Sequence, residues 1–272
     1  DAMQGIQAFI PTAEKVHYLN TLLKVGFDVL DFGSFVSPKA IPQMVDTKDV
    51  IPQLDRSGSD TKLLAIVLNE RGAKDALAFE DVDILGYPLS ISEEFSKRNA
   101  NKTIDQAYSI LKDINALTQA NDREMVVYLS MGFGNPYGEA WSPNTVVEYA
   151  EKVTELGITT LSLADTAGDA TPGRIETVFE LVNKRLPELT VGAHFHAKPE
   201  DATAKIEAAA RAGCRRFDSA MNGYGGCPFA KDSLTGNIAT ETLFDFINAE
   251  GKAERIDEAQ FEVAREEASR LF

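Results

Sequence analysis

Histidine, cysteine and long apolar runs are all scarce in this sequence. Of its 272 residues, three are histidine and two are cysteine. Two cysteines are too few for a disulfide scaffold and suit a reducing compartment. No apolar run approaches the roughly 18 residues that a membrane-spanning helix needs, and the opening DAMQGIQAFI does not resemble a signal peptide. We therefore expect no membrane association, and a location in the cytoplasm of a bacterium or the mitochondrial matrix of a eukaryote.

Positive charge is scarce as well. The chain has 27 Lys and Arg against 42 Asp and Glu, which gives a formal net charge of −15. Nucleic acid is therefore excluded as the main partner, because phosphate binding requires a basic surface. An anionic metabolite is still compatible, since a local cation can hold one. The length allows a core without disulfides and fits a single α/β barrel of roughly 250 residues.

Short apolar runs alternate with amphipathic patterns along the whole chain. The predicted strands are 29–35, 63–69, 82–90, 125–133, 159–166, 189–196 and 215–223. The predicted helices include 11–26, 103–121, 142–157, 171–186, 199–213 and 239–251. Strands separated by helices are typical of a parallel sheet. Seven strands predict a single-domain (β/α)₈ TIM barrel over 1–272, with its first strand largely upstream of Asp1. An open doubly wound sheet is the alternative, but no glycine-rich phosphate loop directly follows a strand.

Unusual polar residues fall where the predicted strands end. They are Asp31, Ser34, Asn69, Glu70, Ser130, Asp165, Thr166, His194 and His196. A glycine-rich loop, NGYGGCPFAKDSLTGN (222–237), follows the last strand, and Asp1 would end the first. In α/β barrels the active site lies at the carboxyl ends of the strands. Polar groups are costly to bury without partners, so this convergence predicts a site.

The motif HFH at 194–196 contains two of the three histidines. Residues i and i+2 of a strand share a face, so both imidazoles can point into the barrel mouth while Phe195 packs outward. Two imidazoles with a carboxylate and an amide oxygen, here from Asp1 and Asn237, suit a divalent metal with open positions. This shell favours Mg²⁺ or Mn²⁺, with Co²⁺ as a third candidate, over structural zinc. The alternative is a pair of core histidines satisfied by hydrogen bonds.

The two cysteines differ in their surroundings. Cys214 lies at a helix end, in ARAGCRR, and is predicted to be a small buried apolar residue. Cys227 lies in GYGGCPF, where Gly225 and Gly226 allow close backbone approach and mobility. The thiol of Cys227 is either a proton donor or acceptor in the site or a second small buried group, and the surrounding residues favour neither.

Five segments resemble, in order along the chain, the sequences of hydroxymethylglutaryl-CoA lyases. They are DAMQG (1–5), SFVSPKAIPQM (34–44), LADTAGDATPG (163–173), HFH (194–196) and GYGGCPFA (223–230) followed by TGNIATE (235–241). These lyases belong to a superfamily of metal-dependent barrels with isopropylmalate synthase, homocitrate synthase and the hydroxy-oxovalerate aldolases. The HxH pair and the opening Asp are shared across that superfamily. The SFVSPK stretch and the GGCP loop are more specific to the lyase.

The resemblance implies roles for individual residues. The metal would be held by Asp1, His194, His196 and Asn237. The catalytic residues would be Cys227, His194, Asp31 and Asp165: Cys227 protonates the departing acetyl-CoA carbanion, and Asp165 lines the site near the metal. The substrate would be contacted by Asn99, Ser34, Gly225 and Gly226.

The reaction implied is the retro-Claisen cleavage of 3-hydroxy-3-methylglutaryl-CoA to acetoacetate and acetyl-CoA. A divalent metal would bind the substrate's hydroxyl and carboxylate oxygens and lower the pKa of the hydroxyl. Either His194 or a carboxylate such as Asp31 would remove the hydroxyl proton, and the enolate would then need nearby positive charge and an acid. The Arg that the family has before its opening Asp lies outside this sequence. The expected partners are an acyl-CoA substrate and a second copy of this chain, with which it would form a homodimer.

Two departures from the family pattern leave alternatives open. Asp31 is one methylene shorter than the family's usual Glu, and AKPEDA after HFH replaces an acidic or Asn residue and a glycine-containing turn. A related lyase, synthase or aldolase acting on another acyl-CoA or keto acid is therefore one alternative, against which the GGCP loop argues. A non-catalytic binding barrel is the other, and the retained metal set and Cys227 disfavour it.

Overall fold

The computed structural model describes residues 2–4, 6, 8–226 and 235–272. Its sheet contains seven strands, all parallel to their neighbours and hydrogen-bonded in chain order. The strands are β1 (Val29–Ser34), β2 (Lys62–Ile66), β3 (Ile84–Ser90), β4 (Glu124–Ser130), β5 (Thr160–Asp165), β6 (Thr190–Phe195) and β7 (Arg216–Asp218). Each lies within its predicted range or begins one residue before it.

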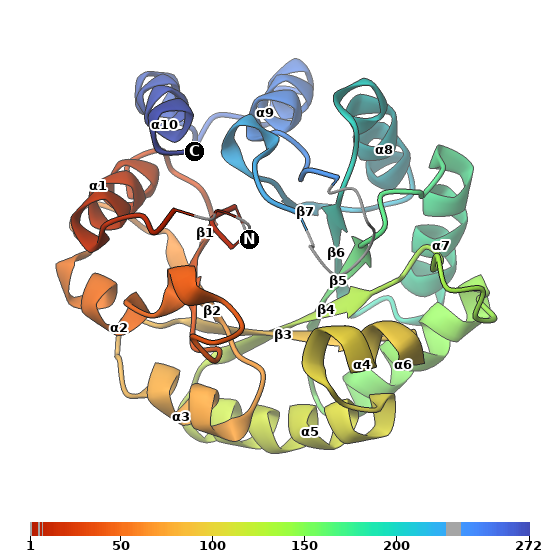
Figure 1. Cartoon of the computed structure of the whole chain (residues 1–272). Helices are drawn as coiled ribbons and strands as arrows, with labels where there is room; N and C mark the ends of the chain where they lie inside the picture. Colours follow the sequence, from red (N-terminus) through yellow and green to blue (C-terminus); the bar gives the residue numbers. More distant parts are fainter. Residues whose placement is uncertain (1, 5, 7, 227–234) are drawn as a thin grey trace.

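Helices surround the sheet on its outer side (Figure 1). They are α1 (Thr12–Leu23), α2 (Thr47–Val50), α3 (Glu70–Leu77), α4 (Glu93–Ala100), α5 (Ile104–Ala120), α6 (Pro143–Glu155), α7 (Pro172–Arg185), α8 (Pro199–Arg211), α9 (Thr240–Ala249) and α10 (Glu258–Leu271). Short 3₁₀ turns occur at Pro42–Met44, Ile51–Gln53 and Met221–Gly223. The six predicted helices are confirmed, and α2, α3, α4 and α10 are additional.

The sheet curls into a half-barrel, and its edge strands β1 and β7 are not paired with each other in the described part of the chain. This is the predicted (β/α)₈ barrel with its first strand missing, so the doubly wound alternative is wrong. The chain before α1 passes close to β1 (Figure 1). Gln43 holds this segment, since its side-chain amide donates to the carbonyl oxygens of Ile6 and Ala8 and accepts from the backbone N–H of Ile10.

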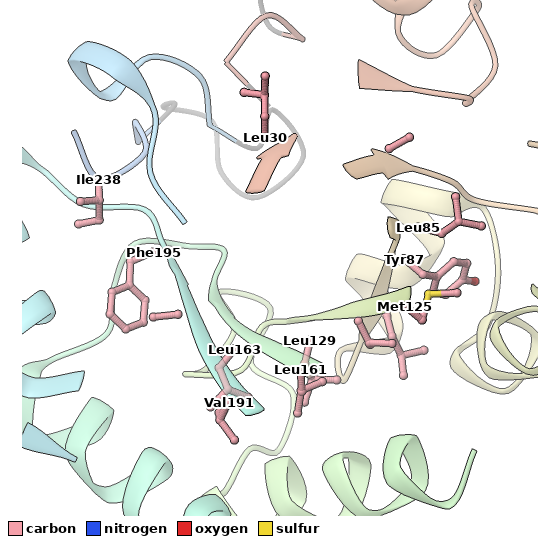
Figure 2. Packing of buried hydrophobic residues seen from close by; sticks show 14 of the residues in the cluster. Leu30, Leu85, Tyr87, Met125, Leu129, Leu161, Leu163, Val191, Phe195 and Ile238 are labelled. Carbon is pink, nitrogen blue, oxygen red and sulfur yellow. The ribbon is translucent and has the colours of Figure 1, made fainter. Parts of the chain in front are cut away.

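The two faces of the sheet carry different side chains. The outer face is apolar, and Figure 2 shows Leu163, Val191 and Phe195 on the helix side of their strands. On the inner face, Leu64, Ile84 and Val126 form a separate buried cluster toward the amino ends of the strands. Closer to the carboxyl ends the inner face is mixed, with polar side chains such as Ser130 and His194 beside apolar ones such as Ile66.

One expectation about strand ends is corrected by the structure. Asn69 and Glu70 lie beyond β2 and start α3: Asn69 is its N-cap and accepts the backbone N–H of Gly72, and Glu70 pairs with Lys74 on the same helix. A capping Asn satisfies one of the free N–H groups at a helix start, so its polarity here serves the helix. Among the described helices, none is long and apolar enough to cross a bilayer.

Candidate active site

A cavity of about 710 Å³ opens at the carboxyl ends of the strands and continues between β1 and β7. Its volume lies within the range typical of small-molecule sites. Six of the predicted site residues line it: Asp31, Ser34, Asn99, His194, His196 and Asn237. They come from β1, α4, β6 and the segment before α9, so the fold brings together residues far apart in the sequence.

Strand register explains why His194 faces this cavity. In the sheet, Ala164 of β5, His194 of β6 and Asp218 of β7 are neighbours in one row. Phe195, the next residue of β6, packs on the outer side against Phe133 and Phe179. The HFH alternation therefore behaves as predicted: both histidines line the cavity, and their ring centroids lie 5.2 Å apart.

His196 and Asn237 are held together at the cavity wall. They form an isolated antiparallel bridge, and the side chains of both are buried. The Nδ1 of His196 lies 3.2 Å from the carbonyl oxygen of Thr235, so this nitrogen carries the proton and Nε2 is left with its lone pair. The amide nitrogen of Asn237 donates to the carbonyl oxygen of Tyr224 at 2.8 Å, so the amide oxygen is the atom that could act as a ligand. Burial, with His194 nearby, lowers the pKa of His196 to about 3, so this ring is neutral.

A layer of charged and polar groups lies on the inner face near His194. Arg216 Nη1 lies 2.9 Å from Asp218 Oδ1, and the Ser162 hydroxyl donates to Asp218 Oδ2 at 2.8 Å. His194 Nδ1 lies 3.5 Å from that same Oδ2. Burial alone would raise the pKa of Asp218, but the charge of Arg216, the nearby His194 and the hydrogen bond from Ser162 lower it to about 2. Asp218 is therefore a carboxylate at any working pH.

Asp31 is the carboxylate that β1 contributes to the cavity. Burial raises its pKa, and the charge of Asp218 adds to the shift, while His194 opposes it. The nearby Ser34 hydroxyl is buried and has no hydrogen-bond partner among the described residues. A buried hydroxyl without a partner costs free energy, which a polar ligand group would recover. Asn99 lies at the end of α4 on the same cavity, half-buried.

Asp165 lies beside the cavity rather than in it. Its row neighbour is the outward-facing Phe195, and its carboxylate pairs with Lys205 of α8 at 2.6 Å. The backbone N–H groups of Asp169 and Ala170 also donate to it. Lys205 donates in turn to the carbonyl oxygens of Gly168 and His196, both at 3.0 Å. The side chains of Ala164 and Thr166 face the cavity. Asp165 lies between them in the strand, so its side chain points to the opposite, outer face, which corrects our placement of Asp165 within the site. Its contacts reach His196 only through Lys205 and the backbone.

Two predicted residues, Asp1 and Cys227, lie outside the described residues. Gly225 and Gly226 are described, with φ of 92° and 130°, and they are not among the cavity residues. The carbonyl oxygen of Gly226 accepts a hydrogen bond from the Gln4 side chain at 3.4 Å, which links the glycine-rich loop to the segment after Asp1. Their role in substrate binding stays a prediction. Cys214 is a free, buried thiol, as predicted.

Three residues of the inner layer were missed by the sequence interpretation: Ser162, Arg216 and Asp218. A signal was present, because Arg216 and Asp218 alternate with Phe217 in a predicted strand, and i and i+2 share a face. Gly192 lies between Ser162 and Arg216 in the same row, and a Cβ there would be 3.1 Å from Arg216 Nη1. The absence of a side chain at Gly192 gives the guanidinium its space.

The donor set fits a divalent cation that prefers nitrogen and oxygen ligands. His194 and His196 supply imidazoles and Asn237 an amide oxygen, all on one cavity. Among the residues that the structure describes, no three His, Cys, Asp or Glu side chains gather as a ligand group. The set consequently rests on two imidazoles and one amide, and its predicted carboxylate, Asp1, belongs to the residues left undescribed.

The fold and this cavity define a class: an α/β barrel with its polar site at the carboxyl ends of the strands. A family model described as HMGL-like matches residues 1–266. The hydroxymethylglutaryl-CoA lyase of Bacillus subtilis is 35% identical over 243 residues, which is 89% of this chain and 80% of that protein. The chain belongs to the HMGL-like family.

Solved structures agree with this assignment. The HMG-CoA lyase of Brucella melitensis superposes with a TM-score of 0.91 at 28% identity, covering 100% of this chain and 95% of that one. An HMG-CoA lyase of Acinetobacter baumannii, solved in complex with coenzyme A and 3-methylmalate, gives a TM-score of 0.89 at 31% identity, covering 97% and 86%.

Proposed function

We propose that this protein is a divalent-metal-dependent lyase that cleaves 3-hydroxy-3-methylglutaryl-CoA to acetoacetate and acetyl-CoA. One observation carries the proposal: on a single cavity, His196 and Asn237 each direct a hydrogen-bearing nitrogen at a backbone carbonyl and keep a lone pair for a ligand. The names of its relatives, and the coenzyme A and 3-methylmalate bound by one of them, support an acyl-CoA substrate.

The metal ligands we propose are Asp1, His194, His196 and Asn237. Such a cation supplies Lewis-acid polarisation of the substrate's hydroxyl and carboxylate oxygens. The protein's own contribution is orientation. A fixed tautomer at His196 and a fixed amide at Asn237 present the correct atoms without rearrangement on binding.

Asp31 is the base that we favour for the substrate hydroxyl. Its carboxylate lines the cavity, and burial raises its pKa, which makes the carboxylate a stronger base. His194, the other candidate, is committed as a ligand. Loss of the proton lets the hydroxyl carbon become the ketone of acetoacetate as the C2–C3 bond breaks.

The electron pair of the broken bond forms the enolate of acetyl-CoA, which a proton must quench. We propose Cys227 as that acid, and Ser34 and Asn99 as polar contacts to the substrate, since both line the cavity. We also propose Gly225 and Gly226 as contacts to the substrate. Asp165 is kept only as a residue that supports the segment around His196.

The test is acetoacetate release from 3-hydroxy-3-methylglutaryl-CoA by the purified protein, after chelation and then addition of Mg²⁺, Mn²⁺ or Co²⁺. We expect metal-dependent activity that falls at least 100-fold in His194→Ala and in Cys227→Ala. Asp31→Glu should retain more activity than Asp31→Asn if Asp31 is the base. Turnover of another acyl-CoA or keto acid with no acetoacetate formed would overturn the substrate, and no turnover of any would favour a binding barrel.

Two coarser features complete the proposal. A reducing compartment suits the buried free thiol of Cys214, and a homodimer is the assembly we predict. Light scattering on the purified protein measures the assembly directly.

A further inference from the structure

We infer that Asp218 is a positioning residue for His194, and that Arg216 fixes which oxygen of Asp218 performs that role. The inference rests on the proposed function, because His194 is a predicted metal ligand. It concerns residues that neither the HFH motif nor the glycine-rich loop contains.

Each oxygen of Asp218 has its own partners. Oδ1 accepts from Arg216 Nη1 at 2.9 Å, whereas Oδ2 accepts from the Ser162 hydroxyl at 2.8 Å and lies 3.5 Å from His194 Nδ1. An acceptor beside Nδ1 places the ring's proton there, so that the lone pair that can bind a metal is on Nε2. At His196 the acceptor is the Thr235 carbonyl oxygen, which is closer to Nδ1, at 3.2 Å. Both imidazoles would therefore have one tautomer before any ligand arrives.

Arg216 determines which atom of residue 218 faces His194, and this can be tested. A guanidinium has only donors, so the group at the Oδ1 position must be an acceptor. In Asp218→Asn the amide oxygen would therefore face Arg216, and the amide NH₂ would face His194 Nδ1. Nδ1 would then have to accept, which moves the ring proton to Nε2 and blocks the atom that binds the metal. The same substitution of a His-orienting carboxylate gives the wrong tautomer in serine proteases.

The experiment has two readouts besides activity. The first is the ¹⁵N NMR tautomer of His194 in metal-free protein, which is tractable because the chain has three histidines. The second is the dissociation constant for Mn²⁺ by calorimetry. We expect Asp218→Asn to shift the His194 proton from Nδ1 to Nε2 and to weaken Mn²⁺ binding by about 10- to 100-fold, the usual effect of an outer-shell change.

A double variant separates positioning from loss of structure. In Arg216→Met with Asp218→Asn, the amide is free to turn its oxygen toward His194. We expect the Nδ1 tautomer to return and Mn²⁺ affinity to recover at least threefold over Asp218→Asn alone. A merely structural role predicts the opposite, because the double variant has also lost the interactions of Arg216.

Asp83→Asn is the matched control. Asp83 also pairs with an arginine, Arg56, at 2.9 Å and accepts a second hydrogen bond from the backbone N–H of Leu63 at 2.8 Å, but it lies just before β3 at the other end of the barrel. It should leave both readouts unchanged. An Nδ1 tautomer retained in Asp218→Asn would overturn the inference whether or not the protein binds Mn²⁺. Failure of the wild type to bind Mn²⁺ or to release acetoacetate would instead count against the proposed function.

Discussion

Two aspartate–cation pairs lie near the carboxyl ends of β5 and β7, which are separated by β6, and they occupy opposite faces of the sheet. Asp165 and Lys205 occupy the outer face, where their side chains are 4% and 3% exposed. Asp218 and Arg216 occupy the inner face, at 21% and 19%, because the cavity reaches them. Lys205 spends its three donors on Asp165 and two carbonyl oxygens, whereas Asp218 keeps an oxygen beside His194.

The face of the strand decides what each pair can do. Removing one partner of a pair that water does not reach strongly destabilises the fold, because the other partner becomes a buried uncompensated charge. A pair that borders a cavity can replace a lost partner by water. One of its members can therefore also interact with an active-site residue such as His194. We therefore expect the outer pair to dominate stability and the inner pair to dominate metal affinity.

The largest expected effect is on the outer pair. Asp165→Ala leaves the Lys205 ammonium buried without its counter-charge, and we expect a loss of about 3–5 kcal/mol in the free energy of unfolding. Urea denaturation followed by circular dichroism measures it. The double variant Asp165→Ala with Lys205→Met should recover more than half of that loss. A single-variant loss under about 1 kcal/mol would show that water reaches the outer pair as well.

A smaller loss is expected on the inner pair. Arg216→Met removes the cation, yet Asp218 keeps the Ser162 hydroxyl and gains cavity water. We expect a loss of about 1–2 kcal/mol in the same urea experiment. A loss equal to that of Asp165→Ala would contradict the distinction between a dry and a wetted pair.

All seven strands could be predicted because buried parallel strands are near-continuous apolar runs. The helices that were not predicted have weaker patterns. In α10, the buried stripe consists of Phe261, Ala264 and Ala268, and alanine gives little hydrophobic contrast. α3 and α4 have eight residues each, and α2 has four.

The prediction of the site was most accurate where the residues of one strand were sufficient for it, as for the two histidines of HFH. It failed where the result depended on the phase of a strand. Asp165 differs by one residue from the inward-facing Ala164 and Thr166, and a shift of one residue moves a side chain to the other face. Asp218 was overlooked because its partners Ser162 and His194 come from two other strands, and register between strands is not visible in a sequence.

The close fit around Arg216 can be tested with a single methyl group. In Gly192→Ala the new Cβ would lie 3.1 Å from Arg216 Nη1 and 3.2 Å from its carbonyl oxygen. Because the backbone oxygen cannot swing away, we expect a loss of about 1 kcal/mol in stability and weaker Mn²⁺ binding. Gly173→Ala is the control: nothing lies within 4 Å of its Cβ, and α7 should be unchanged or slightly stabilised. Equal effects at the two glycines would mean that Arg216 is not held tightly.

The smallest effect concerns the start of β7, where Cys214 donates to the carbonyl oxygen of Arg216. Burial raises the pKa of this thiol from 9.0 to about 12. Between these values the unfolded chain loses the proton and the folded protein keeps it, so stability falls as pH rises through 9 toward 12. The expected contribution is about 1 kcal/mol at pH 10. Urea unfolding at pH 8 and pH 10 measures it, and Cys214→Ala should show a shallower fall than the wild type. Identical slopes would mean that water reaches the Cys214 thiol. That result would contradict the comparison of the two faces, which predicts that water reaches β7 only from the cavity.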